Sequence, residues 1–67
     1  MTNVYVIGIG LIGGSMALDI KAFYPEAKIY GIDANEKHIQ EAIDLKIVEA
    51  KADFADLINA DWVIVSV

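Results

Sequence analysis

Short apolar runs alternate with amphipathic stretches along the first half of the chain. The run from Asn3 to Ile9 is rich in β-branched residues and lacks polar alternation, which is typical of a strand buried on both faces of a parallel sheet. Apolar residues then recur at helical spacing through Tyr24, and Pro25 disfavours helical backbone in the residue before it. The pattern predicts a strand followed by a helix.

A second strand and a second helix are predicted after Pro25. The segment from Lys28 to Asp33 is a short β-rich run bounded by turn-forming residues, which indicates a strand. Asn35 can then cap a helix, and Glu36 would lie favourably in its first turn, near the positive end of the helix dipole. The apolar stripe of this helix continues almost to Lys46.

The pattern is weaker over the following residues. Ile47 to Ala50 is predicted to form a very short strand, and Asp53 to cap a short helix over Phe54 to Asn59. Trp62 to Val67 is again a compact β-branched run, typical of a buried parallel strand. Strands alternating with helices predict an α/β fold, here the N-terminal part of a Rossmann-type, doubly wound parallel sheet.

The length of the chain limits what it can form by itself. It has 67 residues, and a domain of about that size buries only roughly 60% of its unfolded surface. We therefore interpret residues 1–67 as an incomplete, N-terminal part of a dinucleotide-binding domain. Catalytic and dimerisation segments would belong to a longer parent protein.

Composition narrows the classes of partner. Ten acidic residues against five lysines and no arginine leave a net charge of −5, without a basic face for nucleic acid. No uncharged stretch approaches the roughly 20 residues of a membrane-spanning helix. The absence of cysteine excludes disulfides and thiolate metal sites and fits a cytoplasmic protein. Neither a membrane partner nor a metal ion is expected.

The clearest motif lies at the first strand–helix junction. Gly8, Gly10 and Gly13 form a GxGxxG pattern that follows a predicted strand and opens a predicted helix. Asp33 follows about 20 positions later, at the end of the next predicted strand, as the dinucleotide fingerprint requires. The glycine pattern alone would be a weak signal, and this context makes it a specific one.

The glycines have separable physical tasks. Gly8 permits a tight turn out of the strand, Gly10 lets backbone approach a pyrophosphate, and Gly13 allows the helix to pack closely on the sheet. The unpaired amides at the helix start, around Leu11 and Ile12, would point at this ligand with roughly half a positive charge from the dipole. No Gly-Lys pair follows, so a nucleotide-hydrolysing Walker loop is disfavoured.

Asp33 predicts which dinucleotide is bound. Its carboxylate can accept hydrogen bonds from the adenosine ribose hydroxyls and would repel a 2′-phosphate, so NAD is favoured over NADP. Ala34 and Asn35 supply no arginine for that phosphate, although Lys37 lies near enough to keep NADP open.

Further candidates lie outside this motif. Ser66 and Val67 end the last predicted strand, where open α/β sheets place their ligand crevice, so a backbone contact to the cofactor is expected there. His38 is predicted to be solvated and without a role, since catalysis would need partners that this chain lacks. Phe54 and Trp62 are interpreted as core or domain-contact aromatics rather than an adenine platform. No catalytic residue is assigned.

Three segments carry a family resemblance. The sequence VIGIGLIGGSM at residues 6–16, YGID at residues 30–33 and DWVIVSV at residues 61–67 resembles the start of the prephenate dehydrogenase family, which includes the arogenate dehydrogenases. The resemblance covers nearly the whole chain. It carries over, residue by residue, only to the predicted cofactor-binding positions Gly8, Gly10, Leu11, Ile12, Gly13 and Asp33.

The resemblance implies an activity for the parent protein. Such enzymes oxidise prephenate with NAD and release carbon dioxide, giving 4-hydroxyphenylpyruvate on the route to tyrosine. Their substrate-binding histidine and arginine, and a helical domain that forms a homodimer, belong to segments that these 67 residues do not contain. This chain alone is therefore expected to be inactive. Prephenate and arogenate both remain open as substrates.

Two other functions fit the same residues. Another NAD-dependent dehydrogenase, acting on a hydroxy acid or an imine, would begin with a similar strand and glycine turn. A non-enzymatic module that senses NAD(H) would share the whole cofactor site, because a fold and a binding site do not by themselves determine a function.

Overall fold

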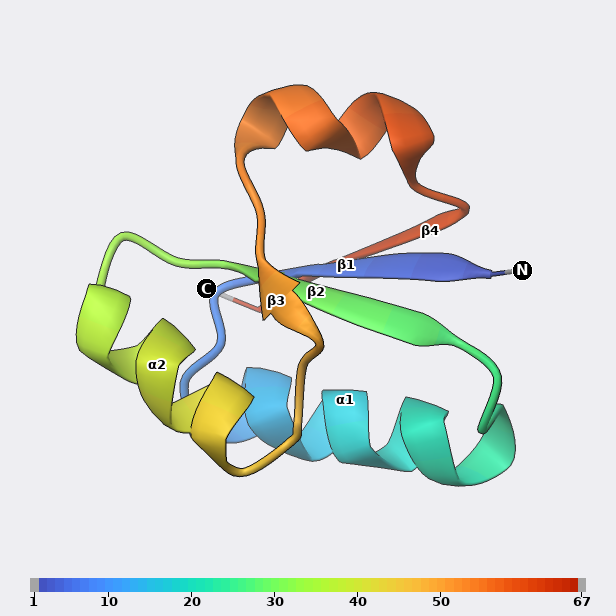
Figure 1. The fold of residues 1–67 in the computed structure, drawn as a ribbon, viewed down its shortest axis with the longest axis horizontal. Helices are drawn as coiled ribbons and strands as arrows, with labels where there is room; N and C mark the ends of the chain where they lie inside the picture. The colour runs from blue at the N-terminus through green and yellow to red at the C-terminus, as the bar shows by residue number, and fades with distance from the viewer. Residues whose placement is uncertain (1, 67) are drawn as a thin grey trace.

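A parallel sheet with the strand order β3-β2-β1-β4 organises the computed structural model, which describes residues 2–66. The elements are β1 (Asn3–Ile7), α1 (Leu11–Phe23), β2 (Lys28–Ile32), α2 (Glu36–Asp44), β3 (Ala50–Lys51), the 3₁₀ helix η1 (Phe54–Asn59) and β4 (Trp62–Val65). Figure 1 shows α1 and α2 together below the sheet and η1 above it. The predicted α/β fold with a Rossmann-type parallel sheet is confirmed.

The central strand β1 fixes the positions of its neighbours. It pairs in parallel with β2 from Asn3 opposite Lys28 to Ile7 opposite Ile32, and with β4 up to Ile7 opposite Val65. The register therefore brings the residues that follow these three strands to one edge of the sheet. These residues are Gly8, Asp33 and Ser66.

The core lies between the sheet and the two α-helices. Val4, Val6 and Ile29 are the largest fully buried side chains, and Ile39 and Ala42 of α2 pack onto the same cluster. Side chains alternate between the two faces of a strand, which places Tyr5 on the opposite face from Val4 and Val6. There its ring stacks on that of Tyr30, with the ring centroids 5.0 Å apart.

Most predicted boundaries agree with the structure to within two residues. β1 ends at Ile7 rather than Ile9, because Gly8 leaves the strand with a φ of 86°. The second helix ends at Asp44, and the chain turns at Lys46, which has a φ of 60°. That left-handed conformation is common just after a helix and ends its hydrogen-bonding pattern.

The predicted third strand at Ile47 to Ala50 is wrong in position. The strand is only Ala50–Lys51, and the preceding apolar residues serve the core instead. Val48 is buried, Ile47 packs against the core, and both N–H groups donate to the Ala42 carbonyl. Hydrophobicity alone does not distinguish these two uses.

The short helix η1 has the bounds that were predicted for it, but Phe54 and Trp62 are more exposed than predicted. Asp53 precedes η1, and its N–H donates to the Asp56 carboxylate at 2.8 Å. Phe54 is 65% exposed and Trp62 56% exposed, so neither is a core aromatic in this chain, and a role of both as domain-contact aromatics stays a prediction. Among residues 2–66, none of the helices reaches the length and hydrophobicity that crossing a bilayer requires.

The β4 edge of the sheet predicts how the 67-residue chain behaves in isolation. β4 lies at the end of the strand order, and Trp62, Val63 and Val65 are exposed there. Because an apolar edge strand is a template for pairing with another chain, we expect concentration-dependent association in sedimentation velocity. Val65→Lys should reduce it, whereas Ala22→Lys, the same charge change on exposed α1 surface, should not. A chain that is monomeric at every concentration would contradict this prediction.

Candidate functional site

The glycine turn brings the end of β1 against the end of β2. Gly8 has a φ of 86°, a left-handed conformation that residues with a Cβ rarely adopt. Its N–H donates to the Ile32 carbonyl at 2.7 Å. The tight turn predicted at Gly8 is therefore present, and it is tied to the neighbouring strand.

Gly13 and Gly10 have opposite surroundings. A Cβ on Gly13 would collide with the carbonyl oxygen of Gly8 and would lie 3.4 Å from the Ser66 hydroxyl. The close packing predicted at Gly13 is present, and the group it packs against is the glycine turn at the end of β1. A Cβ on Gly10 would meet nothing within 4 Å, so backbone is openly accessible at this position.

The start of α1 is a site for a negative charge. Among the described residues no side chain caps this helix, and its first turn carries no acidic residue. The amides of Leu11, Ile12 and Gly13 have no acceptor within the helix, while that of Gly14 bonds to the carbonyls of Ile9 and Gly10. These amides and the helix dipole together favour an anion in front of Gly10.

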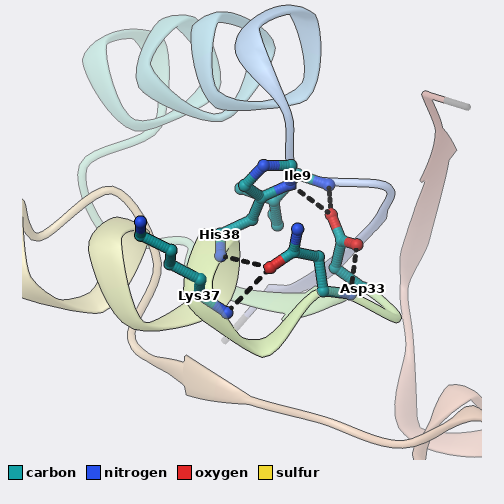
Figure 2. Close-up of polar contacts among 5 residues, drawn as sticks. Ile9, Asp33, Lys37 and His38 are labelled. Atoms are coloured by element: carbon teal, nitrogen blue, oxygen red, sulfur yellow. Dashed lines mark hydrogen bonds and ion pairs between the residues drawn. The ribbon is translucent and has the colours of Figure 1, made fainter.

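Asp33 links the two turns of the site through its carboxylate (Figure 2). Oδ2 accepts a hydrogen bond from the Ile9 N–H at 2.8 Å, and Oδ1 accepts one from the Asn35 N–H at 2.9 Å. The bond from Asn35, followed by that from Ile9 and the neighbouring His38, lowers the pKa of this carboxyl group against the opposing effect of its partial burial. Asp33 is therefore a fixed negative charge at neutral pH.

Asn35 sets the start of α2 beside this carboxylate. Its side-chain oxygen accepts from the Lys37 N–H at 2.9 Å and from the His38 N–H at 3.3 Å. The predicted N-cap is confirmed, with Glu36 in the first turn as expected. The cap fixes the backbone of the helical residues that lie closest to Asp33.

His38 is not merely a solvated surface residue. Its Nδ1 lies 3.6 Å from Asp33 Oδ2, and its side chain is 47% exposed. The signal for this contact was present in the sequence, because a cap at Asn35 turns the third residue of the helix back toward the strand end. Figure 2 shows the side chain of Lys37 pointing away from Asp33.

Two hollows border the glycine turn. A cleft of about 400 Å³ lies over the ends of β1, β2 and β3 and includes Gly8, Asp33, Lys51 and Phe54. A groove of about 420 Å³ runs between α1 and α2 and includes His38. Sequence reasoning missed Lys51 and set Phe54 aside, because only the folded sheet brings η1 to Asp33. In the part of the chain described, no three His, Asp or Glu side chains are grouped to hold a metal ion.

The predicted site residues converge on this edge of the sheet. Gly8, Asp33 and Ser66 follow adjacent strands, and Gly10 to Gly13 form the turn and helix start beside them. The Ser66 N–H already bonds to the Ile7 carbonyl at 2.8 Å, so Ser66 offers its hydroxyl rather than its amide. Val67 lies outside the described residues.

Comparison with known proteins places this arrangement in a family. No protein-family model matches the chain. Prephenate dehydrogenase of Bacillus subtilis (strain 168) is 40% identical over 51 residues, which are 76% of this chain and 14% of that protein. The crystal structure of prephenate dehydrogenase from A. aeolicus, in complex with hydroxyphenyl propionate and NAD+, matches with a TM-score of 0.86 and 34% identity.

The structural match covers 100% of this chain and 24% of the A. aeolicus chain. The chain thus spans only a small part of the length of these two relatives. On their shared sequence and fold, the chain belongs to the prephenate dehydrogenase family.

Proposed function

We propose that residues 1–67 bind the pyrophosphate and adenosine half of NAD, as the N-terminal part of a dinucleotide-binding domain. The observation that carries this proposal is the convergence of two features at one edge of the sheet. These are the uncapped start of α1 next to Gly10 and the fixed carboxylate of Asp33.

The turn suits a pyrophosphate. The space that a Cβ of Gly10 would occupy is open, so phosphate oxygens can approach the backbone closely. The amides of Leu11 and Ile12 can donate to those oxygens, and the Ser66 hydroxyl, beside Gly13, can add a further donor. Val67, the next residue along, completes this set of proposed cofactor contacts. None of these interactions requires a lysine or an arginine.

Asp33 suits the ribose of NAD. Each of its oxygens accepts one backbone N–H, and a carboxylate has about four lone-pair sites, so ribose hydroxyls can still donate to it. A 2′-phosphate would instead face a fixed negative charge. We place the adenine in the adjoining cleft, where Phe54 offers an exposed ring.

For the longer protein, we propose oxidation of prephenate or arogenate. NAD bound at this site would supply the hydride acceptor. Residues of this chain hold and orient the adenosine end and leave substrate binding to residues elsewhere. The A. aeolicus relative binds hydroxyphenyl propionate and NAD+, and hydroxyphenyl and carboxylate groups also occur in the proposed product 4-hydroxyphenylpyruvate. The longer protein is further proposed to be a homodimer.

The activity is tested on the protein expressed from its complete gene. We expect formation of NADH, followed by its absorbance, with prephenate or arogenate as substrate. The 67-residue chain alone should give none, because it has no arginine and nothing that could position a substrate against the nicotinamide. A folded complete protein that binds NAD but oxidises neither compound would contradict the proposal and favour an NAD(H)-sensing role.

The cofactor preference is tested by changing the β2–α2 turn. Asp33→Ser combined with Ala34→Arg should shift the ratio of kcat/KM for NAD and NADP about a hundredfold toward NADP, because a repelling charge is replaced and a phosphate-binding fork is added. Ala34 is chosen because it is exposed, whereas arginine at Asn35 would remove the cap of α2. An unchanged ratio in the folded double variant would show that Asp33 does not recognise the ribose.

The two glycines provide a matched pair. Gly10→Val should weaken NAD binding by at least about tenfold in a variant that still folds, since its side chain would extend into the space assigned to the pyrophosphate. Gly13→Ala should instead lower Tm, because its Cβ would collide with the Gly8 carbonyl. Calorimetric titration and thermal unfolding measure both effects. Unaltered affinity of a folded Gly10→Val variant would refute the placement of the pyrophosphate.

A further inference from the structure

We propose that the groove between α1 and α2 is a second binding site, for a small aliphatic molecule that carries a positive charge. The two helices lie together below the sheet (Figure 1), and the groove between them has a volume of about 420 Å³. Small-molecule sites typically measure about 300 to 1,000 Å³. The inference goes beyond the proposed function and does not depend on the binding of NAD.

The lining of the groove is aliphatic. Ile9 and Ala42 are buried, and Ile47 packs against the core, so these residues form its floor. Leu18 of α1 and Leu45 of α2 are 52% and 71% exposed and line its rim. An apolar cavity of about 150 Å³ already holds benzene. The groove therefore has room for an aliphatic ring with a short polar arm.

Glu41 gives the groove a negative charge. In the part of the chain that the structure describes, no lysine lines the groove, and none of the ion pairs includes Glu41. Lys37, one turn earlier on α2, lies outside the lining, and the imidazole of His38 lies 3.6 Å from the Asp33 carboxylate. A cation in the groove would complement Glu41, and the net charge of −5 acts in the same direction.

Ser15 adds a second acceptor on the other helix. Its hydroxyl lines the groove from α1, whereas the carboxylate of Glu41 lines it from α2. An ammonium group has three N–H donors and no acceptor, so it can donate to both oxygens. An alcohol has a single donor, and a carboxylate would meet the like charge of Glu41. The groove should therefore bind an ammonium compound more tightly than the alcohol, and the alcohol more tightly than the carboxylate.

The length of the groove favours a small molecule over a helix of another protein. On the α1 side the lining runs only from Gly14 to Leu18, which is about one helical turn, or about 6 Å. A docked helix contacts its groove through side chains at i, i+3, i+4 and i+7, which span about 10 Å. The α1 wall is too short for such a contact.

The proposed ligand would lie beside the cofactor without replacing it. Ile9 and Gly10 line the end of the groove next to the glycine turn, and Leu45 lines it at the end of α2, away from Asp33. Glu41 lies between these ends, on the second turn of α2. A ligand bound at Glu41 would leave the space in front of Gly10 free. We therefore expect this ligand and NAD to bind together.

The experiment uses cyclohexylmethylamine as the probe, in the protein expressed from its complete gene. At about pH 7.5 this primary amine is an ammonium ion. Cyclohexylmethanol and cyclohexanecarboxylate present the same ring with a neutral and a negative group. In ligand-observed NMR titrations we expect a Kd on the order of 1 mM for the amine. The Kd of the alcohol should be about three- to fivefold higher, and that of the carboxylate higher still.

Three variants locate the probe. Glu41→Gln should weaken binding of the amine about three- to fivefold and leave that of the alcohol unchanged. Glu36→Gln removes the same charge from the same helix outside the groove, so it should change neither. Ser15→Phe should weaken binding of both, because its ring would fill the groove from an exposed position on α1.

Several results would overturn the inference. These are no binding of the amine, equal affinities for the amine and the carboxylate, or equal losses in Glu41→Gln and Glu36→Gln. Displacement of the amine by NAD would place the probe in the cofactor site and would also overturn it. Failure of the protein to bind NAD would contradict the proposed function alone, because the amine titrations and the variants do not require NAD.

Discussion

The site depends on one carboxylate that joins two turns. Asp33 accepts a backbone N–H from Ile9 in the turn before α1 and another from Asn35 in the turn before α2. The position of the helix start and the position of the charge that we propose to bind the ribose are therefore coupled. A substitution at Asp33 would change the charge proposed to meet the ribose and would also remove the hydrogen bond that holds the glycine turn. Measuring affinity for both NAD and NADP separates the effect on cofactor preference from the general loss of binding that release of the glycine turn would cause.

The parallel register explains why so few charged residues are needed. Because β1 pairs with both β2 and β4 in the same direction, the residues that follow these strands arrive at one edge of the sheet. The turn there presents backbone amides to an anion, in a chain whose net charge is −5 and which has no arginine. We expect the local donors to outweigh the unfavourable overall charge, which acts more weakly because salt screens it over about 8 to 10 Å.

The parts of the structure that follow local rules could be predicted from the sequence. Periodicity located the first four elements, the cap at Asn35 was correct, and the glycine pattern with Asp33 indicated the site. What failed depends on contacts between distant segments. Ile47 and Val48 are as suitable for a core as for a strand, so the position of β3 could not be determined locally. The exposure of Phe54 beside Asp33 became visible only once the sheet had formed. The contact between His38 and Asp33 was overlooked, although the predicted cap at Asn35 already placed the start of α2 next to the strand end.

The proposed division of work within the longer protein follows from where these residues lie. Asp33, Ala34 and His38 belong to a single strand–turn–helix segment, which we propose to lie at the adenosine end of the cofactor. Contacts to the adenosine end are made equally before and during hydride transfer. Such uniform binding acts on KM rather than on kcat. Substitutions in this segment can therefore alter cofactor preference with little effect on the chemical step. A variant that lacks Asp33 needs another group to hold the glycine turn, because the hydrogen bond from the Ile9 N–H to this carboxylate is lost.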